Sequence, residues 1–372
     1  MKKIIIALFI ALSLALFITN AVVKMNLNRR NIISQLQSES SMINVLVAGA
    51  NNFNDNRFSF FMLVSINPDK NSVGLTFIPP TYSVDANDDG SGVKLNSVDF
   101  NDFSIVSKAI ERDIGLKVPF YVSLYSVDAQ RITDLVEGIS LFIFESTKLL
   151  KGLSSGVNYL DGKKSLEYIN NVENNSIYYK YDRVMDIVLS LSKNRELYRK
   201  FINRPFIERA SETLRTNLTI PELESLLQLL VDNTAVHWTL LPGQLEPDGV
   251  YSMDEIARKM YRDTFLRKLV VDSETEKNIK VTILNGTTVS GLAMRTRKTL
   301  MRDGINVVQF GTYHDQNLQK TLIIDQKGDS ERLDLISSKL EIENRHHVID
   351  STQLHDILVI IGNDLGVLND EK

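Results

Sequence analysis

Three apolar, strand-like segments follow one another between Ile43 and Pro80, and they restrict the fold more than any other part of the chain. The first, INVLVAG, ends at Gly49, and the next two, FSFFMLVSINP and SVGLTFIPP, are joined by the short polar sequence DKN. Two apolar strands joined in this way predict a β-hairpin. Pro79 and Pro80 then end the third strand, because proline cannot donate a hydrogen bond to a sheet.

Helical and strand-like patterns alternate along the rest of the chain, which predicts an α/β fold. Residues 161–233 are largely helical, with Asp161 and Asp182 at expected helix N-caps. The charged segment VVDSETEKN precedes a second alternation of strands and helices at residues 279–366. We therefore expect a mixed sheet with flanking helices, followed by a smaller C-terminal α/β domain.

The N-terminal segment MKKIIIALFIALSLALFITNAVVK has the length and apolarity of a transmembrane helix. Two lysines precede the apolar residues Ile4–Val23, and Lys24 follows them. A cleaved signal peptide with its core at Ile4–Ile18 is the alternative, but Thr19–Val22 is a poor cleavage site. We favour an uncleaved anchor. Both interpretations place the body on the extracytoplasmic (periplasmic or outer) side of the cytoplasmic membrane.

These segments divide the chain into six parts. They are a cytoplasmic tip and transmembrane anchor at residues 1–24, a polar stalk at 25–42, a first α/β domain at 43–270, a linker at 271–278, a second domain at 279–366 and a tail at 367–372.

The charge of the chain is unevenly distributed. Lys2 and Lys3 favour a cytoplasmic N-terminus, whereas Lys24, Arg29 and Arg30 oppose it. The first 30 residues hold these five basic residues and no acid, so the remainder has 37 basic and 46 acidic residues and a net charge of −9. An acidic body argues against nucleic-acid binding. The absence of cysteine excludes disulfides, thiolate nucleophiles and cysteine-ligated zinc.

The order of the segments resembles the LytR-CpsA-Psr family, followed by the small C-terminal domain common in that family. In the first domain the resemblance rests on INVLVAG, NRFSFFMLVSINPDKNSVGLTFIP, KLNSVD, YLDGKKSLEYI, YDRVMDIVLSL and HWTLLPGQLEPDGVYSMDEIARKM. In the second it rests on KVTILNGTTVSGLAMRTRKTLMRDGINVV and ILVIIGND. The matching stretches run from about Ile43 to Gly366, nearly the whole predicted extracytoplasmic body.

Family members are membrane-anchored phosphotransferases that move a glycopolymer from a polyprenyl-pyrophosphate carrier to peptidoglycan or a related acceptor. The resemblance implies an apolar cavity beside the sheet for the polyprenyl chain, and acidic residues with Mg²⁺ and an arginine cluster at the pyrophosphate. Arginines and a divalent ion suit this reaction because the leaving pyrophosphate carries charge that must be neutralised. The residues available to line the cavity are Phe58, Phe60, Met62, Val64, Leu75 and Phe77. The simpler interpretation, which we favour, is that these residues form part of the hydrophobic core.

The metal-binding side of the family's site is substituted in this chain. The family's Gly-x-Asp appears as Gly49-Ala50-Asn51, and its Arg-Ser-Asp-Thr appears as Arg57-Phe58-Ser59-Phe60. Both carboxylates are therefore replaced by neutral side chains. Asn51 and Ser59 remain as oxygen ligands for Mg²⁺, but they do not neutralise its charge.

The arginine cluster is substituted as well. The family's Ile-Pro-Arg-Asp appears as Ile78-Pro79-Pro80-Thr81, and Tyr-Val-Arg-x-Arg appears as Tyr168-Ile169-Asn170-Asn171-Val172. Gly-Arg-x-x-Arg-Gln appears as Asp182-Arg183-Val184-Met185-Asp186, which keeps one arginine and replaces the other by an acid. Removing one preorganised charge-stabilising group commonly costs roughly 10²–10³ in rate. We therefore expect weak or lost catalysis on a retained scaffold.

Five polar side chains remain as candidates for the substrate site. They are Arg57, Lys94, Asn96, Asp99 and Arg183. Arg57 and Arg183 keep arginines of the family and are the residual catalytic candidates. Lys94 and Asn96 lie in KLNSVD, which resembles the family's Lys-Ile-Asn-His-Ala stretch. The alternative for Arg183 is an ion pair with a neighbouring aspartate at a helix start.

Two functions follow from this pattern. The first is an extracytoplasmic enzyme, or weak transferase, that acts on a polyprenyl-linked glycan with Mg²⁺. The second is a non-catalytic envelope scaffold or binding protein for a polyprenyl lipid, peptidoglycan or a protein partner engaged by the C-terminal domain. The membrane is a partner in both.

Three histidines near the C-terminus suggest a metal site at first sight. His346 and His347 are adjacent, so on a strand they point to opposite faces, and no carboxylate with suitable spacing completes a set with His355. We therefore interpret them as surface histidines.

Overall fold

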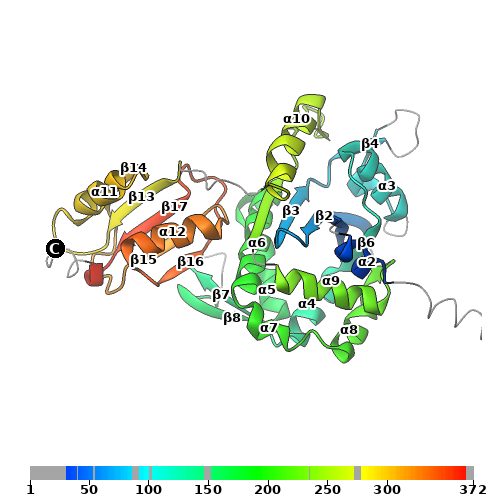
Figure 1. Cartoon of the computed structure of the whole chain (residues 1–372), viewed down its shortest axis with the longest axis horizontal. Coiled ribbons are helices and arrows are strands. Elements are labelled where there is room, and N and C mark those ends of the chain that lie inside the picture. Colours follow the sequence, from blue (N-terminus) through cyan, green and yellow to red (C-terminus); the bar gives the residue numbers. More distant parts are fainter. Residues whose placement is uncertain are drawn as a thin grey trace, which may run out of the picture.

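The computed structural model describes residues 31–39, 41–52, 55–85, 92–99, 103–145, 152–233, 235–271 and 278–365 (Figure 1). The predicted N-terminal anchor lies outside these residues. Among the helices in these ranges, none is long and apolar enough to cross a membrane. Part of the predicted stalk forms helix α2 (Ile32–Ser38), whose Ile33 is buried in the first domain.

A six-stranded mixed sheet forms the centre of the first domain, in the order β10-β3-β2-β1-β6-β9. Its strands are β1 (Ile43–Asn52), β2 (Asp55–Asn67), β3 (Ser72–Ile78), β6 (Phe120–Tyr125), β9 (Arg215–Thr216) and β10 (Ala235–Leu240). The predicted hairpin is present, because β2 and β3 pair antiparallel. The β1–β2 and β6–β9 pairs are also antiparallel, whereas β1–β6 and β3–β10 are parallel.

Helices cover both faces of this sheet. One face packs against α3 (Phe103–Ile114) and against the π-helical segment η3 (Tyr261–Leu266), which continues α10 (Glu255–Met260). The other face packs against α2, α6 (Ile177–Lys193), α8 (Arg204–Ser211) and α9 (Ile220–Asp232). The remaining elements of this domain are β4 (Ser83–Asp85), β5 (Gly92–Lys94), η1 (Leu95–Ser97), α4 (Ser126–Leu135), β7 (Ile139–Ile143), β8 (Gly156–Leu160), α5 (Gly162–Asn170), η2 (Glu173–Asn175), α7 (Arg195–Arg199), β11 (Gln244–Leu245) and β12 (Tyr251–Ser252).

A β-bulge divides the alternating apolar residues of β2 between the two faces of the sheet. Ala50 pairs with Phe58, whereas Gly49 pairs with Phe60, so the register shifts between them. Phe58 consequently packs in the core on the α3 side, and Phe60 packs on the α6 side. Phe58 therefore cannot line one cavity together with the other residues proposed for it, because a bulge reverses the direction of the side chains that follow it.

The apolar residues on the α6 side form core, as the simpler interpretation predicts. Phe77 is fully buried, and its ring lies 4.6 Å from that of Tyr181 on α6. Phe60 and Trp238 each lie 6.0 Å from Phe77, centroid to centroid. This aromatic cluster of Phe60, Phe77, Tyr181 and Trp238 occupies space between the sheet and α6.

The second domain has a five-stranded sheet in the order β14-β13-β17-β15-β16. Its elements are β13 (Lys280–Asn285), α11 (Leu292–Arg302), β14 (Asn306–Thr312), β15 (Leu322–Asp325), α12 (Ser330–Leu340), β16 (Arg345–His347) and β17 (Ile357–Ile361). Leucines of both helices join one core cluster with one face of the sheet, so α11 and α12 cover the same face.

The other face of the second sheet is covered by the first domain. Without that contact, this face would expose Leu322, Ile324, Leu358 and Ile360 to solvent. These residues pack against Phe142 in β7 and Phe144 just after it. Figure 1 shows the β7–β8 hairpin and α6 on the side of the first domain that faces the second domain. Because a sheet must bury both apolar faces, this contact supplies the layer that the second domain lacks.

The expected surface histidines lie in the interface and the core instead. The His346 ring stacks on Phe142 at 3.7 Å, and burial lowers the pKa of His346 to about 4. His347 Nδ1 lies 2.7 Å from the buried Asp325 carboxylate. His355 is only 9% exposed. The surface interpretation is wrong because the first domain covers His346, a buried acid of the second domain holds His347, and His355 is almost completely buried. No metal-binding group of acidic and histidine side chains occurs among the residues that the structure describes.

Candidate functional site on helix α6

Helix α6 begins more than a turn before Asp182, so the expected N-cap at this position is wrong. Ser176 occupies the N-cap, and the helix runs from Ile177. The other expected N-cap is confirmed, because the Asp161 side chain accepts a hydrogen bond from the Lys164 N–H at the start of α5. Asp182 lies within α6, only 4% exposed, and it needs a partner outside its own helix.

Arg183, the candidate arginine of α6, contacts Tyr168 and Asp186. Its Nη1 donates to the Tyr168 hydroxyl at 2.6 Å and lies 3.7 Å from the Asp186 carboxylate. The guanidinium carbon lies 4.6 Å from the centre of the Tyr168 ring. The predicted alternative, an ion pair with a neighbouring aspartate, is therefore present. The side chain keeps 25% exposure and is open to one side.

Asp186, which the sequence resemblance places at the family's second arginine, binds the second domain. One carboxylate oxygen accepts the Tyr168 hydroxyl at 2.5 Å, and the other accepts the backbone N–H of Ile349 at 2.6 Å. Burial raises the pKa of this carboxyl to about 7, against the lowering effect of Arg183 and of both hydrogen bonds. The acid thus fixes α5 and the second domain to the same point of α6.

Asp182 makes a second bond to the same loop of the second domain. Its Oδ2 accepts hydrogen bonds from the backbone N–H and from the hydroxyl of Ser351, at 3.1 and 3.0 Å. Burial raises the pKa of this carboxyl, and the bonds from Ser351 oppose the increase. Asp182 and Asp186 lie one helical turn apart, so they bind Ser351 and Ile349 in the same direction.

Trp238 forms a further contact between the two domains, beside α6. Its indole N–H donates to the backbone carbonyl of Lys327 at 2.6 Å. Gly328 follows, and a Cβ placed on it would lie 2.7 Å from the Trp238 Nε1. Only a glycine fits at this distance, and the positive φ of 78° there also favours glycine.

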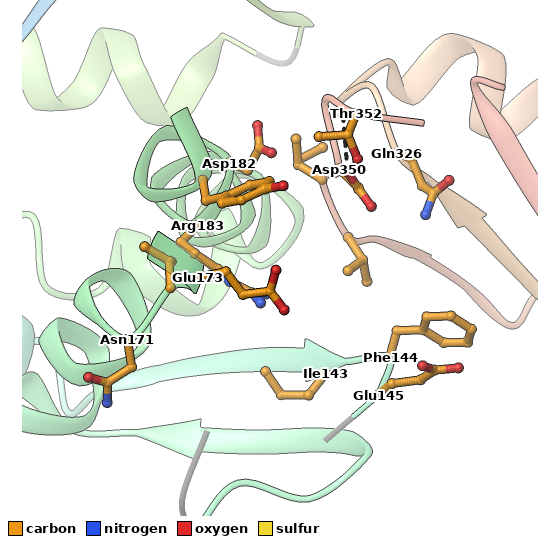
Figure 2. A pocket seen from close by; sticks show the side chains of 14 residues that line it. Ile143, Phe144, Glu145, Asn171, Glu173, Asp182, Arg183, Gln326, Asp350 and Thr352 are labelled. Atoms are coloured by element: carbon orange, nitrogen blue, oxygen red, sulfur yellow. Dashed lines mark hydrogen bonds between the residues drawn. The ribbon is translucent and has the colours of Figure 1, made fainter. Parts of the chain in front are cut away.

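A cavity of about 290 Å³ remains between α6 and the second domain. Figure 2 shows Asp182 and Arg183 of α6 opposite Gln326, Asp350 and Thr352 of the second domain. The charged side chains that line it are Glu145, Glu173, Asp182, Arg183 and Asp350. Arg183 is therefore accompanied by four carboxyl groups, which repel rather than bind a pyrophosphate.

The other candidate residues lie elsewhere in the first domain. Arg57 and Asp99 face each other in an isolated antiparallel bridge. Lys94 ends β5, and Asn96 lies in η1, where its backbone N–H donates to the Pro80 carbonyl at 2.8 Å. None of these four lines the cavity beside Arg183. The structure thus brings Arg57 and Asp99 together and places Arg183 in a separate environment.

Asn51 and Ser59 do not form a suitable Mg²⁺ site. The Ser59 hydroxyl donates to Asn51 Oδ1 at 3.1 Å, so the two predicted ligands bind each other. Mg²⁺ in proteins is usually held through one or two carboxylates together with substrate phosphates, and this pair offers only an amide and a hydroxyl. We derive no metal-assisted step from it.

Three contact residues, Tyr168, Asp182 and Asp186, were not among the predicted site residues. The sequence marked Asp182 as an expected N-cap and as a substitution in one family pattern, Asp186 as a substitution in the same pattern, and Tyr168 as the first position of another pattern. Two acids one turn apart on the same helix face repel each other unless something binds them. That spacing could have marked the two acids as binding residues from the sequence alone. The loop that binds them could not be identified in this way, because it lies in a distant part of the sequence.

Comparison with known proteins agrees with this architecture. Residues 278–365 match the family described as LytR cell envelope-related transcriptional attenuator. Among solved structures, TagT bound to LI-WTA matches with a TM-score of 0.52 at 17% identity, covering 63% of this chain and 93% of that one. The ywtF protein from Bacillus subtilis matches with a TM-score of 0.51 at 18% identity, covering 62% of this chain and 92% of that one.

No curated protein matches the sequence. At identities below 20% the structural likeness establishes a common fold. The chain therefore has the fold of the LytR-CpsA-Psr family and carries a LytR C-terminal domain, as its sequence resemblance predicts.

Proposed function

We propose that this protein is a membrane-anchored, extracytoplasmic cell-envelope protein that has lost the phosphotransfer of its family and acts as a binding or scaffold protein. The observation that carries the proposal is that acidic side chains of α6 bind the second domain. Two positions that hold a glycine and an arginine in the family hold Asp182 and Asp186 here, and both acids bind the second domain. The surface that would receive a pyrophosphate is occupied by part of the same chain.

Electrostatics support the same conclusion. A leaving pyrophosphate needs several cations, and the cavity beside Arg183 is lined by one arginine and four carboxyl groups. Arg57 lies outside this cavity, so it does not join Arg183 in a clamp. Binding a polyanion here would require displacement of the loop that contains Ile349 and Ser351.

Packing supports a reduced lipid site. The aromatic cluster of Phe60, Phe77, Tyr181 and Trp238 occupies the α6 side of the sheet, where we expected a polyprenyl cavity. A cavity of about 330 Å³ remains beside it, lined by Tyr178, Tyr181, Trp238 and Leu240 together with Lys327 and Ser351 of the second domain. This volume is at the lower end of small-molecule pockets, which makes the cavity short for a long isoprenoid chain.

A residual transferase is the second candidate function, and one observation favours it. Arg183 is retained, 25% exposed, and directed at a cavity. TagT has been solved bound to LI-WTA, so a related lipid-linked glycopolymer is the substrate class to test.

The test compares the purified full chain with TagT on a polyprenyl-pyrophosphate-linked glycan, with Mg²⁺ present. We expect transfer by TagT and none above background by this chain. An Arg183→Ala variant should behave like the parent chain. Turnover near the rate of TagT would refute the proposal, and turnover that is slow but abolished by Arg183→Ala would establish the residual transferase.

Lipid extraction and mass spectrometry of the purified chain then distinguish the binding roles. Co-purified polyprenyl phosphate without turnover identifies a lipid-binding protein. A preparation free of polyprenyl lipid favours a scaffold for peptidoglycan or a protein partner.

A further inference from the structure

The outer surface of the second domain carries a group of cations that the interface with the first domain does not use. Helix α11 has the sequence LAMRTRKTLMR, with four basic residues and no acid. Residues 278–365 contain 10 basic and 11 acidic residues, so the rest of this domain is acidic. The four cations are Arg295, Arg297, Lys298 and Arg302. In the described part of the chain none of them forms an ion pair, unlike Lys339 of α12, which pairs with Asp303.

The buried side of α11 fixes the direction of these side chains. Leu292, Ala293, Thr296 and Leu300 are buried against the sheet. At about 100° per residue, the opposite side of the helix is centred on Lys298, with Met294 and Met301 on one side of it and Arg302 and Arg295 on the other. These methionines are 38% and 48% exposed and lie two turns apart on the same side of the helix.

Cations flank the two methionines on both sides. Arg297 lies on the side of β14, where its guanidinium carbon is 4.9 Å from the centre of the Phe310 ring, and Phe310 is itself 39% exposed. Lys298, Arg302 and Arg295 follow on the other side of the helix. We call this surface, made of the four cations with Met294, Met301 and Phe310, the α11 surface.

The α11 surface faces away from the first domain. α11 covers one face of the second sheet, and Phe142 and Phe144 of the first domain cover the opposite face. Figure 1 shows α11 and β14 on the side of the second domain remote from the first. The surface is therefore free to contact a partner while the two domains remain docked.

We propose that the α11 surface binds an anionic lipid bilayer. It combines exposed apolar side chains with neighbouring cations, which is the composition of protein surfaces that lie on a membrane. Methionines enter the headgroup region while arginine and lysine contact lipid phosphates, each cation adding attraction near an anionic surface. A linear polyanion needs only cations, whereas here the exposed side chains of Met294, Met301 and Phe310 share the surface with the cations. The proposal goes beyond the function proposed above and does not depend on whether phosphotransfer is retained.

The test uses the full chain reconstituted in nanodiscs. Because the chain has no cysteine, Met294→Cys introduces a unique site for an environment-sensitive fluorophore. We expect blue-shifted emission in discs that contain phosphatidylglycerol, but not in discs of phosphatidylcholine alone. The shift should be weakened by high salt, which screens exposed charges.

Charge reversal provides the matched comparison. In the labelled chain, we combine Arg295→Glu, Lys298→Glu and Arg302→Glu. This triple substitution should lower the ratio of membrane-bound to unbound α11 surface by roughly a hundredfold or more. A control triple, Lys164→Glu, Arg209→Glu and Lys259→Glu, makes the same change in net charge at exposed positions of the first domain and should leave the shift intact. Trp238 emission checks that both triples keep the domains docked.

Three results would overturn the proposal. They are an equal shift in neutral and anionic discs, a loss of the shift in both triples, and a shift produced in neutral discs by soluble polyglycerol phosphate. The last result would identify a phosphate-bearing polymer as the partner in place of the bilayer.

Discussion

At the scale of single residues, the decisive feature is the pair of acids on α6. A buried carboxyl is costly unless hydrogen bonds satisfy it, and both Asp182 and Asp186 obtain these bonds from backbone N–H groups of the second domain. An arginine at position 186 would instead place a cation against the Ile349 N–H. The acid at position 186, where the family pattern leads us to expect an arginine, therefore makes a docking contact with the second domain.

Titration of Asp186 leads to a prediction about pH. Its pKa is raised by burial from 3.8 to about 7, so between about pH 4 and 7 the folded protein holds a proton that the unfolded chain releases. Its contribution to the free energy of unfolding is thus fully present below about pH 4 and is lost as the pH rises through 7. Asp186→Asn removes this titration. We expect the stability of the parent chain relative to the variant to fall between pH 4 and 8 in urea unfolding.

Asp248→Asn is the control, because Asp248 is exposed in a turn. The difference between this variant and the parent chain gives the baseline for the same substitution at a solvent-exposed position. If the Asp186→Asn difference follows this baseline, Asp186 does not titrate differently in the folded protein.

At the scale of elements, the position of α5 decides whether Tyr168 reaches α6. Gly162 is the first residue of α5, and a Cβ on it would overlap the backbone carbonyl of Gln130 in α4. Because the obstacle is backbone, it cannot move aside as a flexible side chain would. We expect Gly162→Ala to destabilise the protein by about 1–3 kcal/mol in urea unfolding.

Gly49→Ala in β1 is the matched control for this change. A Cβ there would lie 3.5 Å from the Cβ of Phe60, an ordinary contact. Its stability should change little or rise by a few tenths of a kcal/mol, because alanine restricts the unfolded chain more than glycine does. Equal effects of the two substitutions would show that α5 does not depend on close approach to α4.

The elements themselves were largely predictable, and the errors have identifiable causes. The apolar runs of β1, β2 and β3 and the helical patterns of residues 161–233, where α6 and α9 lie, were sufficient, because each has the repeat of a buried strand or of an amphipathic helix. The strand β8 was missed because Val157 and Tyr159 are exposed, so its sequence lacks an apolar run. The N-cap at Asp182 was wrong because this acid is stabilised by Ser351, which lies 169 residues away in the chain.

At the scale of the whole molecule, the docking of the two domains could not have been predicted from local patterns. Leu322 and Ile324 alternate with residues of the opposite face, which predicts a strand buried on both sides. The pattern does not identify the residues that cover Leu322 and Ile324, because these are Phe142 and Phe144 of the other domain. The candidate site could not be predicted for the same reason, because its two acids bind a loop that lies more than 160 residues away in the sequence.

The docked arrangement can be tested with a single internal reporter. Trp238 is the only tryptophan of the chain and donates to the Lys327 carbonyl across the interface. In Gly328→Ala the new methyl group would lie 2.7 Å from Trp238 Nε1, so the second domain must shift or separate. We expect the emission of Trp238 to move to longer wavelength as water reaches the indole.

Gly304→Ala separates this clash from ordinary backbone strain. Gly304 has a positive φ of 81°, close to the 78° of Gly328, but a Cβ there meets no atom within 4 Å. Both variants therefore carry a backbone cost of roughly 1 kcal/mol, and only Gly328→Ala disturbs the interface. A red shift confined to Gly328→Ala supports the docked arrangement, and with it the closure of α6. Identical spectra for the two variants would mean that Trp238 does not contact the second domain in solution, and the argument for an occupied α6 surface would then fail.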